Sequence, residues 1–142
     1  EGGDGAVAIK RVFVGGGAPP NRNPVVESLE IDGEPLVDAD PSLRLPACEA
    51  GSCPRRTVRA RYAEGSAERF VVVEFGTPRE RTEDLYMSWF ATAGEFVRIR
   101  SGGTEPEVEW VQPEGVGAVV FYFVGHDGRG GQDWAVRRVV VE

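Results

Sequence analysis

The stretch that decides the fold is Ala118-Val-Val-Phe-Tyr-Phe-Val-Gly-His126, followed by Asp127-Gly-Arg-Gly-Gly-Gln-Asp133 and then by Trp134-Ala-Val-Arg-Arg-Val-Val-Val-Glu142. Two runs of β-branched and aromatic residues flank a glycine-rich polar turn, which is typical of an antiparallel β-hairpin. Because a two-stranded hairpin is only marginally stable alone, other parts of the chain must pack against it. The C-terminal end therefore predicts an all-β fold in which the preceding strands cover this hairpin.

The first strand of the hairpin has two apolar faces. One face carries Val119, Phe121 and Phe123, and the other carries Val120, Tyr122 and Val124. Because side chains alternate between the faces of a sheet, such a strand is either covered on both sides or presents an apolar surface to a partner. We expect the segment formed by residues 6–14 to act as the cover.

The second strand of the hairpin does not alternate strictly. Trp134 and Val136 lie in one register and Val139 and Val141 in the other, with Arg137-Arg138 between them. One extra residue in a strand of an antiparallel pair produces such a shift. The sequence therefore predicts a β-bulge at Arg137-Arg138.

The composition favours one all-β domain. The chain has 142 residues with 19 glycines, 10 prolines and one methionine, and no apolar run approaches the roughly 20 residues of a membrane-spanning helix. This indicates many short segments joined by turns. The net charge of −7 repels phosphate backbones, which disfavours nucleic acid as a partner.

Segments with a period of two predict about eight or nine strands, arranged as two stacked antiparallel sheets. Before the hairpin, the expected strands are residues 6–14, 25–31, 57–62, 70–75, 84–92, 95–100 and 108–111. The glycine- and proline-rich break at residues 15–20 divides an N-terminal strand and linker, residues 1–20, from a sandwich domain, residues 21–142. Residues 76–84 are expected to be a charged loop and residues 101–104 a turn.

Three local patterns give the strands their faces and ends. Residues 84–92 place Trp89 inward, as in a central sandwich strand with a core tryptophan. In residues 25–31, Val25, Leu29 and Ile31 share one side. Asp32-Gly33 is a strong turn signal, and the four prolines of residues 34–54 exclude a central strand there.

The two cysteines, Cys48 and Cys53, lie in a loop with glycine inside it and proline on both sides. Such a loop brings the sulfur atoms together, so we expect a disulfide that staples residues 34–54. A metal site or a reduced redox pair is the alternative, but no third or fourth cysteine or histidine lies nearby to complete tetrahedral coordination. A disulfide implies an oxidising compartment. The expected location is therefore extracytoplasmic: the periplasm, the outer membrane or the cell surface.

The chain starts at Glu1-Gly-Gly-Asp-Gly, without a methionine or an apolar signal segment. We expect that a leader preceded Glu1 in the precursor. A glycine-rich start also follows the lipid-bearing cysteine of bacterial lipoproteins. We therefore expect a lipid anchor upstream of Glu1.

The closing hairpin carries a family resemblance. The run Tyr122-Phe-Val-Gly-His-Asp127, then glycines, then Val139-Val-Val141, resembles the end of bacterial immunoglobulin-like, PKD-like and cadherin-like repeats. Asn23-Pro24, Ser88-Trp89-Phe90 and the Asp127 turn with Trp134 are also similar to uncharacterised lipoproteins of myxobacteria and their relatives. The resemblance covers most of residues 24–142. It implies an immunoglobulin-like β-sandwich and a role in adhesion, assembly or spacing.

Catalytic chemistry is not favoured by the sequence. The single histidine, His126, is adjacent to Asp127 in a strand, so the two side chains point to opposite faces and cannot form a base with its orienting carboxylate. Ser66 lacks the second glycine of a nucleophile elbow. No phosphate loop, dinucleotide fingerprint or zinc pattern occurs. We therefore expect that the chain is not an enzyme.

Calcium is a weaker alternative. Asp127 and Asp133, which flank the glycine-rich turn, are weak candidates for calcium ligands. Other loops carry Asp32, Asp38 and Asp40, so carboxylate oxygens could converge at one end of the sandwich. Turns that contain aspartate and glycine explain these residues without a metal. We therefore expect no metal and no cofactor.

Aromatic side chains are the best candidates for binding. The expected partner-binding residues are Tyr122, Val124, Trp110 and Trp134, although core packing is the ordinary role of large aromatic side chains in a sandwich. The prediction is a non-catalytic exported module for protein–protein interaction, assembly or spacing at a bacterial cell envelope. Its partner is an envelope protein or another domain of the same protein. The alternative is a carbohydrate-binding or calcium-dependent adhesive domain.

Overall fold

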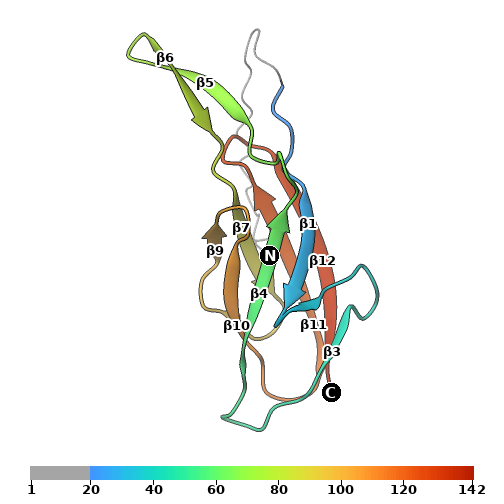
Figure 1. Cartoon of the computed structure of the whole chain (residues 1–142). Coiled ribbons are helices and arrows are strands. Elements are labelled where there is room, and N and C mark those ends of the chain that lie inside the picture. The colour runs from blue at the N-terminus through green and yellow to red at the C-terminus, as the bar shows by residue number, and fades with distance from the viewer. Residues whose placement is uncertain (1–19) are drawn as a thin grey trace, which may run out of the picture.

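A computed structural model describes residues 20–142, which form an all-β fold with no helix in that range (Figure 1). The expected strand at residues 6–14 lies outside the described residues. The part of the chain that the structure describes has twelve strands: β1 (Val26–Ile31), β2 (Glu34–Pro35), β3 (Leu43–Leu45), β4 (Arg55–Tyr62), β5 (Arg69–Glu74), β6 (Thr77–Thr82), β7 (Tyr86–Ala91), β8 (Glu95–Phe96), β9 (Arg100–Gly102), β10 (Glu107–Val111), β11 (Gly117–His126) and β12 (Gln132–Val141). This number exceeds the predicted eight or nine, because several strands have only two or three residues.

The strands form two five-stranded sheets and one separate hairpin. Sheet A has the order β2-β1-β4-β10-β8, and sheet B has the order β3-β12-β11-β7-β9. Among the described residues β5 and β6 pair only with each other, and they project from one end of the sandwich (Figure 1). All strand pairs are antiparallel except β3 with β12. No helix of the described residues is long and apolar enough to cross a membrane.

The two sheets enclose one core, as in a β-sandwich. The largest fully buried side chains are Trp89, Trp110, Phe121 and Phe123. Trp110 of sheet A meets Phe121 of sheet B edge-on, with ring centroids 4.9 Å apart. Such a pair adds about 1 kcal/mol to the free energy gained from burying the two rings. The predicted core position of Trp89 is confirmed, since only 1% of it is exposed.

The C-terminal hairpin forms as predicted, but without the bulge. β11 and β12 pair continuously, from Gly117 opposite Val141 to His126 opposite Gln132. The prediction of a β-bulge at Arg137-Arg138 is therefore wrong. Arg137 keeps the register of the buried Val139, and its guanidinium donates hydrogen bonds to the carbonyl oxygens of Leu36 and Val136. A long side chain whose charged end finds acceptors can occupy an inward position, so no register shift is needed.

The bulge lies instead in the first strand. The pairing of β1 with β4 shifts between Val26 and Ser28, so that two residues of β1 oppose one of β4. As a result Val26 packs against the core together with Leu29, whereas Val25 is exposed. The prediction that Val25 shares the inward side with Leu29 is wrong for this reason. The Asp32-Gly33 turn is confirmed, because both residues have positive φ, 52° and 86°, as a two-residue hairpin turn requires.

Three other predicted segments differ from the structure. Residues 77–82, predicted to be part of a loop, form β6, because the Phe75-Gly76 turn folds them back along β5. Residues 95–100, predicted to be one strand, are divided between β8 in sheet A and β9 in sheet B. β9 also includes Ser101 and Gly102, which were predicted to be a turn. Local patterns of alternation do not show that a chain crosses between sheets.

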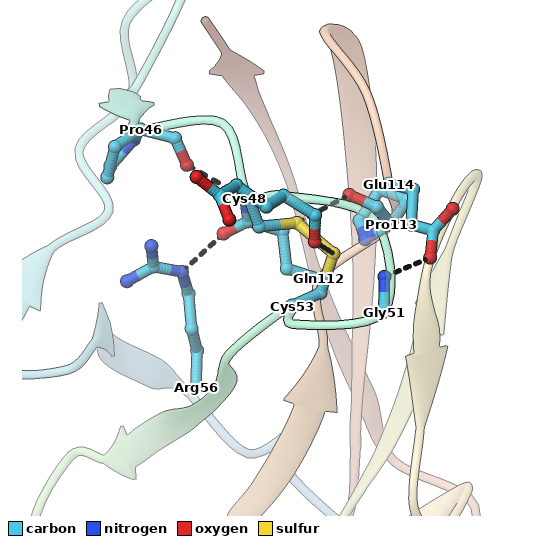
Figure 2. Close-up of a disulfide and its surroundings, with 9 residues drawn as sticks. Pro46, Cys48, Gly51, Cys53, Arg56, Gln112, Pro113 and Glu114 are labelled. Atoms are coloured by element: carbon cyan, nitrogen blue, oxygen red, sulfur yellow. Dashed lines mark hydrogen bonds between the residues drawn. A yellow bond between two sulfur atoms is a disulfide. The ribbon is translucent and has the colours of Figure 1, made fainter.

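The proline-rich segment contributes only edge strands, as predicted. β2 and β3 each lie at the edge of a sheet. The disulfide between Cys48 and Cys53 is confirmed, with Cα atoms 5.0 Å apart. Figure 2 shows that the buried Gln112 also holds this loop, since its amide nitrogen donates to the carbonyl oxygen of Pro46 at 2.8 Å and its amide oxygen accepts from Arg56 at 2.7 Å.

Candidate functional site

The outer faces of the two sheets have opposite chemistry. On sheet A, arginines of β4 make ion pairs with glutamates of neighbouring strands, for example Arg59 with Glu107 at 3.0 Å and with Glu30 at 3.1 Å. Arg55 pairs in the same way with Glu109 at 3.2 Å. Exposed ion pairs of this kind add little to stability, but they keep the face hydrated, which disfavours the binding of an apolar partner. Sheet A therefore presents a solvent face.

The outer face of sheet B is aromatic and apolar. We define the outer patch as Phe90 of β7, Tyr122 and Val124 of β11, and Trp134 and Val136 of β12. Tyr122 lies directly opposite Phe90 on one side and Val136 on the other, and Val124 lies opposite Trp134. The exposed fractions are 71% for Trp134, 49% for Phe90 and 44% for Tyr122. A contiguous apolar surface of this kind marks an interaction site more often than single exposed residues do.

The outer patch arises from strict alternation in β11 and β12. Because their pairing has no bulge, Val119, Phe121 and Phe123 face the core and the residues between them face outward. The structure thus brings together three of the four predicted partner-binding residues, Tyr122, Val124 and Trp134. Phe90 joins them from β7, since alternation puts it on the side opposite to the inward Trp89, but it is not among the predicted binding residues.

Trp110, the fourth predicted partner-binding residue, lies in the core. It is fully buried, and its indole nitrogen donates to the carbonyl oxygen of Ala93 at 3.2 Å. A partner cannot reach it in this structure. The prediction failed because a tryptophan in a short alternating strand has the same local sequence pattern whether its side faces the core or the solvent.

A polar stack borders the outer patch. The rings of His126 and Tyr86 are stacked, with centroids 4.4 Å apart and planes 10° from parallel. The Arg100 guanidinium lies 5.5 Å from the centre of the Tyr86 ring. Burial lowers the pKa of His126, and the nearby Arg100 lowers it further, whereas Asp127 acts in the opposite direction. These effects favour the neutral form of the imidazole.

The pairing of His126 does not provide a catalytic base. Its Nε2 lies 3.2 Å from the hydroxyl oxygen of Ser88, and its Nδ1 lies 3.3 Å from the amide nitrogen of Gln132. With the Gln132 amide in this orientation its nitrogen donates to Nδ1, which assigns the ring proton to Nε2, the nitrogen that faces Ser88. Activation of a serine needs an unprotonated Nε2 and an acceptor, usually a carboxylate, at Nδ1. Neither requirement is met by this arrangement.

The two aspartates that flank the hairpin turn are occupied by N–H donors. The buried Asp127 accepts hydrogen bonds at Oδ1 from the backbone of Arg129 and Gly131, at 2.7 and 2.9 Å, and at Oδ2 from the Asn21 amide at 2.6 Å. Asp133 accepts from the backbone N–H of Val26 at 2.7 Å. Their carboxylates hold the turn and the start of β1. In residues 20–142, no group of three or more histidine, cysteine, aspartate or glutamate side chains is placed to bind a metal ion.

Ser66 also has a structural role. Its hydroxyl oxygen accepts a hydrogen bond from the backbone N–H of Val25 at 3.1 Å. The side chain is buried in the turn that follows β4. Ser66 therefore ties this turn to the start of β1.

A second apolar surface lies on the β5–β6 hairpin, which we call the finger (residues 69–82). Val71, Val73 and Phe75 have exposed fractions of 66%, 69% and 107%. The finger projects beyond the end of the sandwich, so these side chains have no core to face (Figure 1). The apolar run at residues 70–73 predicted a strand, but sequence alone gave no sign that this strand leaves the two sheets.

No family model matches the sequence, and no curated protein and no solved structure is significantly similar to it. The function must therefore be argued from the two apolar surfaces and the fold that presents them.

Proposed function

We propose that this chain is a non-catalytic immunoglobulin-like module that binds a protein partner through the outer patch of sheet B. The strand orders support the immunoglobulin-like assignment. β1-β4-β10-β8 corresponds to the A-B-E-D sheet of such domains, and β12-β11-β7 corresponds to G-F-C. The buried Trp89 on β7 also fits the tryptophan expected on strand C. The disulfide differs, because it staples a loop instead of joining the two sheets.

The contrast between the two outer faces carries the proposal. Cross-strand ion pairs cover sheet A, whereas three large aromatic side chains lie exposed together on sheet B. Tryptophan and tyrosine are enriched among the residues that dominate binding energy, and they have few rotatable bonds to immobilise. A rigid sheet that presents them needs little ordering when it binds, which favours affinity.

The compartment proposed for this interaction is extracytoplasmic. The Cys48–Cys53 disulfide supports it, because such bonds persist in oxidising compartments. The resemblance of the sequence to bacterial lipoproteins points to the cell envelope. There the partner is another envelope protein or a further domain of the same protein.

The experiment is site-specific photocrosslinking in the producing cell, followed by affinity measurement. A photoreactive amino acid replaces Trp134 in one variant and the exposed Ile99, outside the patch, in a matched control. We expect an adduct only from position 134. The partner so identified is then purified, and Trp134→Ala is expected to weaken its binding by ~10-fold or more, while Ile99→Ala leaves it unchanged. Equal crosslinking from both positions, or an unchanged affinity of Trp134→Ala, would contradict the proposal.

A second candidate is carbohydrate binding, which the geometry of the patch favours over the calcium-dependent alternative. Trp134, Tyr122 and Phe90 lie on neighbouring strands of one sheet face, and exposed aromatic rings of this kind can stack on sugar rings. A glycan array tests this directly. Glycan binding that disappears in Trp134→Ala but not in Ile99→Ala would favour the sugar, and an array without binding would remove this candidate.

A further inference from the structure

The two edges of the finger are protected to different degrees. The N–H of Glu83 donates to the carbonyl of Glu68 at 3.0 Å, which fixes the phase of the hairpin ladder. Because hydrogen-bonded pairs alternate along an antiparallel ladder, Phe70, Val72 and Glu74 direct their backbone groups toward β6. Arg69, Val71 and Val73 therefore direct theirs away from it. By the same alternation, Pro78 and Glu80 of β6 direct their backbone groups toward the opposite outer edge of the finger.

The outer edge of β6 carries features that block strand addition. Pro78 has no N–H to donate at an outward position, and charged residues follow it at positions 79, 80 and 81. Proline and charge are the usual means by which natural sheets protect their edges. The outer edge of β5 has only valine and phenylalanine from residue 70 to residue 73. One edge of the finger is thus closed to another strand, and with the other edge no strand of residues 20–142 pairs.

We propose that the open edge of β5 pairs antiparallel with β5 of a second copy of this chain, forming a four-stranded β6-β5-β5-β6 sheet across a two-fold axis. In the register that places Val72 opposite Val72 of the second copy, Val71 lies opposite Val73. The outward backbone groups of Val71 and Val73, which pair with no strand among the described residues, then form hydrogen-bonded pairs with the second copy. The exposed valines of both copies then form cross-strand pairs on one face, which reduces the apolar area that they expose to water.

The charges at the ends of β5 favour this antiparallel orientation. β5 begins at Arg69 and ends at Glu74. A parallel, in-register pair would place each arginine beside its own copy, and each glutamate likewise, which is repulsive. Antiparallel pairing places Arg69 of one copy beside the Glu74–Phe75 end of the other. In this register Arg69 lies opposite Phe75, so its guanidinium can approach the ring of Phe75.

The tip of the finger supports a contact at this position. Phe75 has a φ of 51°, a left-handed conformation that bulky residues rarely adopt, and its side chain is fully exposed. Asparagine or aspartate is the usual residue at this position of a two-residue hairpin turn. An exposed aromatic side chain held in a strained conformation is an outlier of the kind that clusters at functional sites. In the proposed dimer this ring covers Arg69 of the second copy.

The base of the finger is fixed to the sandwich, so the open edge has a defined direction. Arg129 of the β11–β12 turn pairs with the buried carboxylate of Glu83 at 2.8 Å. The same guanidinium lies 4.4 Å from the ring centre of Phe70. Glu83 also accepts a hydrogen bond from the backbone N–H of Glu68 at 2.9 Å. This cluster limits the motion of the finger before pairing, which reduces the entropy lost on association.

The first test uses proline at matched positions on the two edges. Val73→Pro removes an outward N–H from the open edge, and Glu80→Pro removes one from the protected edge, while neither removes a hydrogen bond between β5 and β6. Analytical ultracentrifugation of the whole chain up to ~1 mM suits an interface smaller than the standard ~1,600 Å². We expect a concentration-dependent dimer that Val73→Pro abolishes and Glu80→Pro retains, with both variants melting at the wild-type temperature.

The second test fixes the register. The chain has no free cysteine, so Val72→Cys adds a single reactive thiol. In the proposed register two such thiols lie directly opposite each other and form an intermolecular disulfide on mild oxidation. Glu74→Cys is the control, because its two copies lie about 13 Å apart along the strands and do not join.

The dimer proposal is overturned by a protein that stays monomeric over the whole concentration range. A dimer that persists in the Val73→Pro variant also overturns it. If Trp134→Ala abolishes such a dimer, the two copies associate through the outer patch and not through β5. Efficient crosslinking of Glu74→Cys with none of Val72→Cys would also contradict it. None of these results depends on the identity of the envelope partner, so the dimer and the proposed function fail separately.

Discussion

At the scale of single residues, the buried polar side chains that were candidates for metal binding or catalysis have structural roles instead. Asp127, a weak candidate for calcium, accepts three hydrogen bonds and has no exposed surface. Gly131 is required beside it, because a Cβ at that position would lie 2.0 Å from Oδ2 of Asp127. The Asp127-Gly-Arg-Gly-Gly turn is thus built around one carboxylate.

Asp127→Ala is therefore expected to destabilise the fold. The substitution leaves the N–H groups of Arg129 and Gly131 and the amide of Asn21 without their acceptor. The expected loss is about 2–4 kcal/mol in the free energy of unfolding, measured by denaturant titration. Asp38→Ala is the control, because its side chain is 94% exposed, and it should change stability by less than ~0.5 kcal/mol. Equal effects of the two substitutions would show that Asp127 does not hold the turn.

The lowered pKa of His126 predicts how the free energy of unfolding depends on pH. Its pKa is lowered in the folded protein, first by burial and then by Arg100, from an ordinary value of 6.5. The unfolded chain therefore binds a proton more readily than the folded chain. This contribution to stability is fully present above pH 6.5 and is lost as the pH falls from 6.5 through the lower, folded pKa.

An NMR titration of the single histidine measures this shift. We expect a midpoint below 6.5, and a midpoint that moves upward but stays below 6.5 in Arg100→Ala, because burial is the larger cause. His126→Gln should remove the corresponding part of the pH dependence of unfolding. A midpoint at or above 6.5 in the wild type would contradict the packing described for this ring.

At the scale of elements, the sequence predicted the strands that lie inside the sheets better than those that leave them. Alternation over six or more residues located β4, β7 and β11, a valine-rich run after the glycine-rich turn located β12, and a tight turn signal located the end of β1. It did not locate β6, because Thr77–Thr82 is charged on both faces and, within residues 20–142, pairs only with β5. It also placed the bulge in β12, because a paired inward arginine cannot be recognised without the carbonyl groups that accept its hydrogen bonds.

The disulfide loop is an element whose stability can be measured separately. A cystine that closes a loop this short restricts the unfolded chain only modestly, so replacing both Cys48 and Cys53 with serine should cost about 2 kcal/mol in the free energy of unfolding. The fold should persist, because Gln112 and Glu114 still hold the loop at Pro46 and Gly51 (Figure 2). A double-serine variant that is unfolded at 25 °C, judged by circular dichroism, would show that the loop depends on the disulfide.

At the scale of the whole molecule, the aromatic residues divide between a core that joins the two sheets and an outer patch. The sequence predicted that β11 is apolar on both faces, and this follows from alternation alone. It could not determine which tryptophan faces which side, because that depends on how the sheets stack. Trp110 lies against Phe121 inside, and Trp134 lies beside Val124 outside.

The measurement that tests this division most directly is the free energy of unfolding of Trp110→Ala compared with that of Trp134→Ala. The expected loss is about 3–5 kcal/mol for Trp110, whose removal leaves a cavity between the sheets, and less than ~1 kcal/mol for Trp134. If Trp134→Ala is as destabilising as Trp110→Ala, the outer patch is part of the packed interior and cannot be the surface that binds a partner.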